Sequence, residues 1–150
     1  MAATPPADGT GRAEGDLEEL ATRLFAMARS GETESLDAYV AAGVPPDLAN
    51  DSGDTLVMLA AYHGHASTVA ALLGRGALPD RPNDKGQTPL AGATFKGEAD
   101  VMQALLDGGA DPRAGQPTAV DTATMFGRDD LLALFGEPGG TPRPGVDPSG

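Results

Sequence analysis

The stretch that decides the fold is residues 55–73, TLVMLAAYHGHASTVAALL, because it returns 33 positions later as residues 88–106, TPLAGATFKGEADVMQALL. Each copy opens on a Thr, is broken in the middle by a Gly and ends on a pair of Leu residues. Apolar residues at helical spacing on either side of the Gly predict two short helices joined by a tight turn. A helix pair that recurs at a fixed period of this length is typical of a solenoid, in which each unit packs on its neighbours.

The repeat extends in both directions from this stretch. Gly31, Gly64 and Gly97 lie 33 positions apart, whereas Gly127 follows after only 30. The segments 1–15 and 137–150 have no periodicity and are rich in Pro and Gly, so we expect disordered tails there. The remainder predicts one repeat domain over residues 16–136, built of four units at about 17–49, 50–82, 83–114 and 115–136.

Capping residues indicate where the helices begin. Asp16, Thr55 and Thr88 each precede an apolar periodic run and are expected to be N-caps. Pro89 suits the first helical position, because its missing N–H would have no partner there. Among the helices expected are those at about residues 17–29, 33–41 and 66–73, with a last pair at about 118–127 and 129–135.

Three segments resemble the ankyrin repeat in one register, namely NDKGQTPL at residues 83–90, AAYHGH at 60–65 and LLDGGADP at 105–112. The resemblance covers residues 17–136 and implies an all-α solenoid in which turns shaped like hairpin fingers join the helix pairs. It implies two full repeats between two caps, because the first copy has no recognisable finger and the last copy is shortened. Met58 and Ala91 replace the His that the family usually carries after its Thr-Pro-Leu opening.

The apolar spacing also predicts which residues form the core of this solenoid. Truncating one of its Leu residues to Ala should cost about 2–5 kcal/mol, because a cavity is left in addition to the lost burial. The residues expected to be buried are Leu24, Leu36, Val57, Ala60, Val69, Leu72, Leu73, Leu90, Val101, Leu105, Leu106, Leu131 and Leu134.

The composition narrows the classes of function. The chain has no Cys, which excludes disulfides and thiolate chemistry, and its net charge of −12 argues against binding nucleic acid or an anionic membrane. Its first residues show no basic segment followed by an apolar one, and no apolar run approaches the length of a membrane span. We therefore expect a soluble, cytoplasmic monomer. The abundance of Ala, Gly and Pro fits a bacterial genome of high G+C content.

Residues that could carry chemistry are few. His63 and His65 lie near Asp51 and Asp54 in the sequence, but side chains two residues apart in a helix do not face each other, so no metal site is expected. The resemblance gives His65 a structural role at the break between helices. Residues 80–86 lack the carboxylate pattern of a calcium loop, and no nucleophile with an orienting base is recognisable. The sequence therefore predicts no enzyme, no metal and no cofactor.

The resemblance places a partner-binding surface on the residues before the inter-helix glycines and on the fingers. Two tracks are expected, the first with Tyr62, Phe95 and Met125 and the second with Ser30, His63, Lys96 and Phe126. The finger residues expected to form a mostly acidic rim are Asp51, Ser52, Asp54, Asp84, Lys85 and Gln87. Aromatic side chains are enriched at binding hot spots, so a protein partner with basic groups at its edge is expected.

Other readings of this surface stay open. The aromatic side chains could serve only to pack neighbouring inner helices together, and the fingers could be solvated turns without a partner. A non-enzymatic interaction module is the main hypothesis for the function. An acidic decoy of a basic nucleic-acid-binding protein is the alternative, which requires a continuous patch of carboxylates. An enzyme is a remote third hypothesis, which requires a perturbed titratable pair in a closed pocket.

Overall fold

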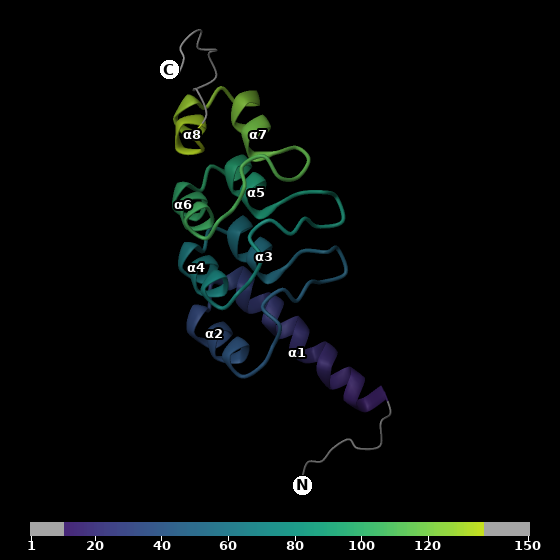
Figure 1. Ribbon diagram of the computed structural model, residues 1–150. Coiled ribbons are helices and arrows are strands. Elements are labelled where there is room, and N and C mark those ends of the chain that lie inside the picture. The colour runs from purple at the N-terminus through teal and green to yellow at the C-terminus, as the bar shows by residue number, and fades with distance from the viewer. Residues whose placement is uncertain (1–10, 137–150) are drawn as a thin grey trace.

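The computed structural model describes residues 11–136, which form eight helices stacked as four antiparallel pairs (Figure 1). The tails at residues 1–10 and 137–150 lie outside the described residues, so the predictions made for them stay predictions. The helices are α1 (Gly11–Ser30), α2 (Thr33–Ala41), α3 (Leu56–Tyr62), α4 (Ala66–Gly74), α5 (Pro89–Lys96), α6 (Ala99–Asp107), α7 (Ala119–Met125) and α8 (Asp129–Leu134).

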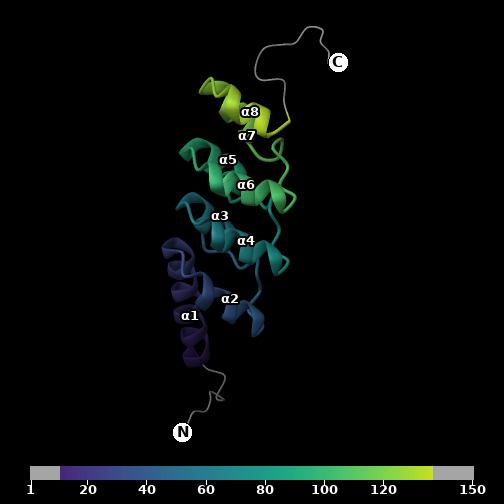
Figure 2. The ribbon, with the colours of Figure 1, turned by 90° about the vertical axis from the view of Figure 1, so that its left-hand side faces the viewer.

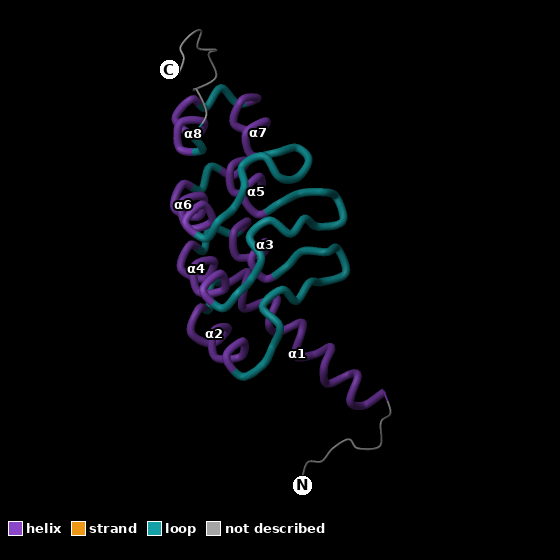
Figure 3. The backbone as a smooth tube through the Cα atoms, viewed as in Figure 1, coloured by secondary structure: helices purple, strands orange, loops and turns teal. Residues whose placement is uncertain are grey.

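The pairs stack in two rows. Helices α1, α3, α5 and α7 form an inner row in which each contacts the next, and α2, α4 and α6 follow one another in an outer row that α8 continues. The outer row faces the viewer in Figure 2. The loops that join one unit to the next project from the inner row on the side away from the outer row (Figure 3). The all-α solenoid expected from the repeat is therefore the fold of residues 11–136.

A threonine caps the inner helix of each unit after the first, buried at Thr55 and Thr88 and half-buried at Thr118. The Oγ1 atoms of Thr55, Thr88 and Thr118 accept hydrogen bonds from backbone N–H groups three residues on, at 3.1, 3.2 and 2.9 Å. These bonds satisfy donors that the first helical turn leaves without a partner. The predicted caps at Thr55 and Thr88 are confirmed, and Pro89 occupies the first turn of α5 as expected.

The inter-helix glycines are required by their backbone conformation and by crowding. Gly31, Gly64 and Gly97 have φ values of 75°, 82° and 75°, in the left-handed region that other residues adopt with strain. A Cβ atom on Gly31 would lie 2.5 Å from the ring of His65. Nε2 of that ring lies 2.8 Å from the carbonyl oxygen of Arg29, so His65 ties the second unit to the first. This contact is the structural role that the resemblance implied.

The first two fingers, residues 50–54 and 83–87, are built alike. Oδ1 of Asn50 accepts hydrogen bonds from the backbone N–H groups of the residues two and four positions on, at 2.9 and 3.0 Å. Asn83 repeats this arrangement at 2.9 and 3.0 Å. In each finger an amide side chain folded onto its own backbone sets the shape, which explains the Asn at this place in both copies.

Most of the predicted core is confirmed. Ten of the thirteen residues named are buried, and Leu73 and Leu106 are half-buried beside the core. The prediction that Leu134 is buried is wrong, because its side chain is 36% exposed. It ends the short helix α8 in the last unit of the stack, where Leu132 and Phe135 point inward in its place. In the pairs Leu72–Leu73 and Leu105–Leu106 the first Leu is buried and the second half-buried, so the first of each makes the deeper core contact.

The first helix is longer than expected. Helix α1 begins at Gly11 and runs through Gly15, so residues 11–15 are helical where the sequence predicted a tail. Asp16 lies inside this helix and is not its N-cap. A capping residue followed by acids marks a helix start only when the chain before it is not helical already. The extension carries α1 out of the stack below the row of fingers (Figure 1).

Candidate functional site

Large apolar side chains are exposed at the ends of three consecutive inner helices. Tyr62 of α3 is 41% exposed, Phe95 of α5 60%, and Met125 and Phe126 at the end of α7 71% and 50%. We call these four residues the apolar row. Each stands one or two positions before an inter-helix glycine, where the helix turns away and leaves its last side chains uncovered.

The apolar row is also packed against itself. The ring centroids of Phe95 and Phe126 lie 5.7 Å apart with the planes tilted by 47°, and His63 meets Tyr62 edge-on at 5.8 Å. Nζ of Lys96 lies 4.4 Å from the centre of the Tyr62 ring. Tyr62, Phe95 and Phe126 thus each contact a ring or a cation and also keep a large exposed area, and binding of a partner by these side chains stays a prediction.

A small hollow opens beside this row. It has a volume of about 150 Å³ and is lined by Tyr62, Phe95, Ala91 and Gly92, among others. A Cβ atom on Gly92 would lie 3.5 Å from the Tyr62 ring and would take up part of the space. The remaining lining residues are Gln87, Pro117 and Thr122. A hollow of this size, with mostly apolar walls, suits one aliphatic side chain of a partner.

The finger residues divide into exposed groups and groups that hold the fingers together. Asp51, Asp84 and Lys85 are exposed, as is Ser52. Asp54 is half-buried, and its Oδ1 accepts a hydrogen bond of 2.8 Å from Nδ2 of Asn83 in the next finger. Gln87 is exposed and accepts from the same Nδ2 group at 2.8 Å. Asp54 and Gln87 thus have a structural bond in addition to any contact with a partner.

The histidines are engaged by the backbone. Nδ1 of His63 lies 2.9 Å from the carbonyl oxygen of Leu59, and His65 bonds the preceding unit as described above. Among residues 11–136, no three His, Asp or Glu side chains gather as metal ligands. The helices of the same range include none that is both long enough and apolar enough to cross a membrane.

A second series of hydrogen bonds, which the sequence reasoning missed, joins the units on the outer side. Oδ1 of Asp47 accepts from the backbone N–H of Leu78 at 2.8 Å, and one period later Asp80 accepts from that of Asp111 at 2.9 Å. Burial raises the pKa of the Asp80 carboxyl above its ordinary value of 3.8, more than the hydrogen bond from Asp111 lowers it. The spacing of Asp47 and Asp80, 33 positions, was the signal that could have revealed these bonds.

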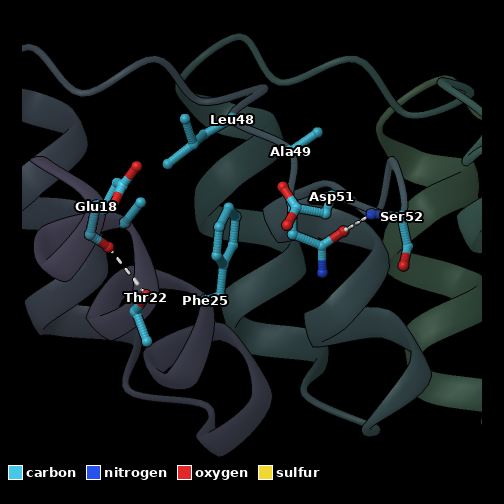
Figure 4. A pocket seen from close by; sticks show the side chains of 9 residues that line it. Glu18, Thr22, Phe25, Leu48, Ala49, Asp51 and Ser52 are labelled. Carbon is cyan, nitrogen blue, oxygen red and sulfur yellow. Dashed lines mark hydrogen bonds between the residues drawn. The ribbon is translucent and has the colours of Figure 1, made fainter. Parts of the chain in front are cut away.

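A wider groove at the N-terminal end of the stack was also missed. It has a volume of about 570 Å³ and lies between α1 and the first finger. Glu18, Thr22 and Phe25 come from α1 and face Leu48 and the finger across it (Figure 4). Ala21, Ala49, Asn50, Asp51 and Ser52 complete the lining. The absence of a finger from the first copy was the signal for this site, because an open face remains where a finger would lie.

Comparison with known proteins gives the family. A family model described as ankyrin repeats, in three copies, matches residues 24–116. A curated ankyrin repeat protein of Pseudomonas aeruginosa is 47% identical over 57 residues. That match covers 37% of this chain and 33% of the Pseudomonas protein. The chain thus matches about a third of the length of this curated relative, and the match does not extend to the whole of either protein.

Proposed function

We propose, since the chain belongs to the ankyrin repeat family, that it is a protein–protein interaction module without enzymatic activity, acting as an adaptor or a regulatory subunit. Ankyrin repeats generally bind other proteins. The partner is held between the inner helices and the fingers, where the predicted site residues lie. Hydrogen bonds join successive units in register, so the backbone that carries these side chains needs little rearrangement to meet the partner.

The observation that carries this proposal is the apolar row. Soluble chains seldom leave four large apolar side chains exposed side by side without a use for them. Tyr and Phe bury much area for little loss of conformational entropy, which is why such residues dominate binding energies. The hollow between Tyr62 and Phe95 gives the partner a place for an apolar anchor.

The charge of the fingers supports a partner with basic groups near that anchor. Asp51 and Asp84 are exposed at corresponding positions of successive fingers, one unit apart. Exposed charges at the edge of an interface mainly speed association and select against like-charged partners. Lys85 and Lys96 interrupt the acidic surface, so the preferred partner carries a few well-placed cations rather than a uniformly basic face.

The same distribution favours an adaptor over a decoy of nucleic acid. A decoy needs carboxylates in a continuous line that imitates a phosphate backbone. Here Asp37 is bound by Arg75 at 2.8 Å, Asp130 by Arg128 at 2.8 Å, and Asp54 by Asn83. Catalysis has less support still, because the raised pKa of Asp80 belongs to a carboxylate that bonds the backbone between two units.

A pulldown from cells of the source organism tests the proposal, with wild-type bait compared with Tyr62→Ala/Phe95→Ala. Loss of two hot-spot side chains should weaken capture of a specific partner by at least about 30-fold, which corresponds to about 2 kcal/mol. Leu78→Ala is the matched control, because Leu78 is a large apolar residue, 55% exposed, that is not part of the apolar row. Urea unfolding checks that each bait is folded. A partner captured equally by the folded double variant contradicts the proposal.

A further inference from the structure

Hydrogen bonds join each later finger to the finger before it, whereas the first finger has no finger before it. The backbone N–H of Asp84 in the second finger donates to the carbonyl oxygen of Ser52 in the first, at 3.0 Å. Nδ2 of Asn83 donates to Oδ1 of Asp54 at 2.8 Å. The turn that precedes α7, which we call the third finger, continues the series, since the N–H of Gln116 donates to the carbonyl oxygen of Gly86 at 2.8 Å. Each finger therefore directs donors toward the finger before it.

The first finger presents the same two donors with no finger before it. Asn50 and Asp51 stand one period before Asn83 and Asp84. Because Oδ1 of Asn50 is held by the same pair of backbone N–H groups as Oδ1 of Asn83, its Nδ2 is oriented in the same way. Within residues 11–136, neither Nδ2 of Asn50 nor the backbone N–H of Asp51 meets an acceptor. The first finger therefore presents two hydrogen-bond donors for which the described residues supply no acceptor.

The groove that Asn50 and Asp51 help to line combines apolar and acidic side chains. Its walls are α1 and residues 48–52, and its volume is about 570 Å³ (Figure 4). Phe25 and Leu48, both half-buried, supply an apolar surface. Glu18 and Asp51 are the charged side chains among the residues that line it, and both are acidic. The groove thus offers two hydrogen-bond donors, an apolar wall and two carboxylates within one site.

We propose that this groove is a second recognition site, which binds an extended segment of a partner protein carrying a Lys or Arg side chain. Two carbonyl groups of the segment take the place of the missing finger, one accepting from the N–H of Asp51 as Ser52 accepts from Asp84, and the other accepting from Nδ2 of Asn50 as Asp54 accepts from Asn83. The cation meets Glu18 and Asp51, in the charge-assisted contact that carboxylates make best with Lys and Arg. An alternate side chain of the same extended segment points the other way, onto Phe25 and Leu48.

A second copy of this chain does not fit the groove. Helix α8 at the other end of the stack exposes Asp129 next to the Arg128–Asp130 ion pair, so head-to-tail association would bring a surface of net negative charge toward Glu18 and Asp51. Like charges brought together in this way cost binding energy. The groove is also separate from the apolar row, whose residues stand on α3, α5 and α7. The two sites share Asp51, but no residue of the apolar row lines the groove, so Tyr62→Ala/Phe95→Ala distinguishes failure of the proposed function from failure of the second site.

Nuclear magnetic resonance locates the binding directly. The probe is the peptide acetyl-Ala-Arg-Leu-Arg-Leu-Arg-Ala-amide, added to the ¹⁵N-labelled full chain at up to about 1 mM, where even a weak site fills. The backbone amide of Asp51 and the side-chain amide of Asn50 should shift most. The equivalent groups of Asp84 and Asn83, which are already bonded, should shift least. A peptide with Glu in place of each Arg should cause no shift.

Charge-neutral variants test the role of the carboxylates. Glu18→Gln/Asp51→Asn should weaken binding of the Arg peptide about tenfold by fluorescence anisotropy, because two charge-assisted contacts become neutral. Glu19→Gln/Asp100→Asn is the matched control, which removes the same net charge from the neighbouring position of α1 and from the exposed surface of α6, and it should bind as wild type does. Tyr62→Ala/Phe95→Ala should also bind this peptide as wild type does. Unshifted Asn50 and Asp51 signals, or equal weakening by both charge-neutral pairs, would overturn the second site.

Discussion

The ammonium of Lys96 rests over the ring of Tyr62, 4.4 Å from its centre, and so joins the third unit of the stack to the second. The contact is diagonal, since Lys96 stands directly before its inter-helix glycine and Tyr62 stands two positions before the preceding one. Phe126 and Phe95 repeat the same relation one unit on, with ring centres 5.7 Å apart. The repeat thus sets where each side chain meets the next unit, while the residue type decides whether that contact is a cation on a ring or a ring on a ring.

A double-mutant cycle should measure the Lys96–Tyr62 contact. Lys96→Met keeps much of the apolar stem and removes the charge, and Tyr62→Leu removes the ring. Exposed cation–π contacts contribute about 0.5–1 kcal/mol, so the coupling energy from urea unfolding should fall in that range. Lys85→Met paired with Tyr62→Leu is the control, because the cation over the Tyr62 ring is that of Lys96 and not that of Lys85, and its coupling should be close to zero. A coupling near zero for Lys96 as well would show that the contact does not stabilise the fold.

Truncation of core and end leucines should separate two classes of Leu that the sequence alone treats alike. Leu90→Ala removes a side chain with no exposed area from the centre of the stack and should cost about 2–5 kcal/mol. Leu134→Ala removes a side chain that is 36% exposed at the end of α8, and its cost should be well below that of Leu90→Ala. Urea unfolding of both variants checks this order, and equal costs would contradict the assignment of Leu134 to the surface.

The parts of the fold that repeat could be predicted from the sequence, and the ends could not. Thr55 and Thr88 were identified as caps because the same residue stands at the same place in two copies. Leu134 was assigned to the core from its apolar spacing, but it stands 30 positions after the half-buried Ala104, and its side chain is 36% exposed. Helix α1 likewise follows no repeat, so its start at Gly11 depended on propensity alone, which is a weak guide.

The candidate site was predictable to a similar degree. Positions before the inter-helix glycines pointed to Tyr62, Phe95 and Phe126, and the structure places these side chains in one exposed row. Spacing could not show that Asp54 bonds Asn83 of the next finger, because that contact depends on how the units are offset. The absence of a finger from the first copy marked the place of the N-terminal groove, but spacing alone could not show how α1 and residues 48–52 enclose it.

The fingers give a matched pair of substitutions. Asn83→Asp keeps the Oδ1 acceptor but loses the donor to Asp54 and sets two carboxylates against each other, so it should cost about 1–3 kcal/mol in urea unfolding. Asn50→Asp makes the same chemical change in the first finger, where Nδ2 donates to no acceptor among residues 11–136. Its cost should be smaller by at least about 1 kcal/mol. If both substitutions cost the same, the bond between fingers contributes nothing to stability.

The pH dependence of stability should differ in sign between two aspartates. Burial raises the pKa of Asp80 above 3.8, so the folded state holds its proton more tightly than the unfolded state does. Its contribution to stability is therefore present below pH 3.8 and is lost as the pH rises through the folded pKa. Asp80→Asn removes this titration and keeps an oxygen that can accept from the N–H of Asp111. The variant should gain stability relative to wild type as the pH rises from 3 to 7.

Asp37 provides the opposite case in the same molecule. The hydrogen bond from Arg75, at 2.8 Å, lowers the pKa of Asp37 below 3.8, and the charge of the guanidinium acts in the same direction. Its contribution to stability is present above pH 3.8 and is lost as the pH falls through the folded pKa. Asp37→Asn should therefore lose stability relative to wild type over the same rise in pH, by a small amount because the pair is exposed to solvent. Urea unfolding at a series of pH values compares the variants, and slopes of the same sign would show that burial does not dominate at Asp80.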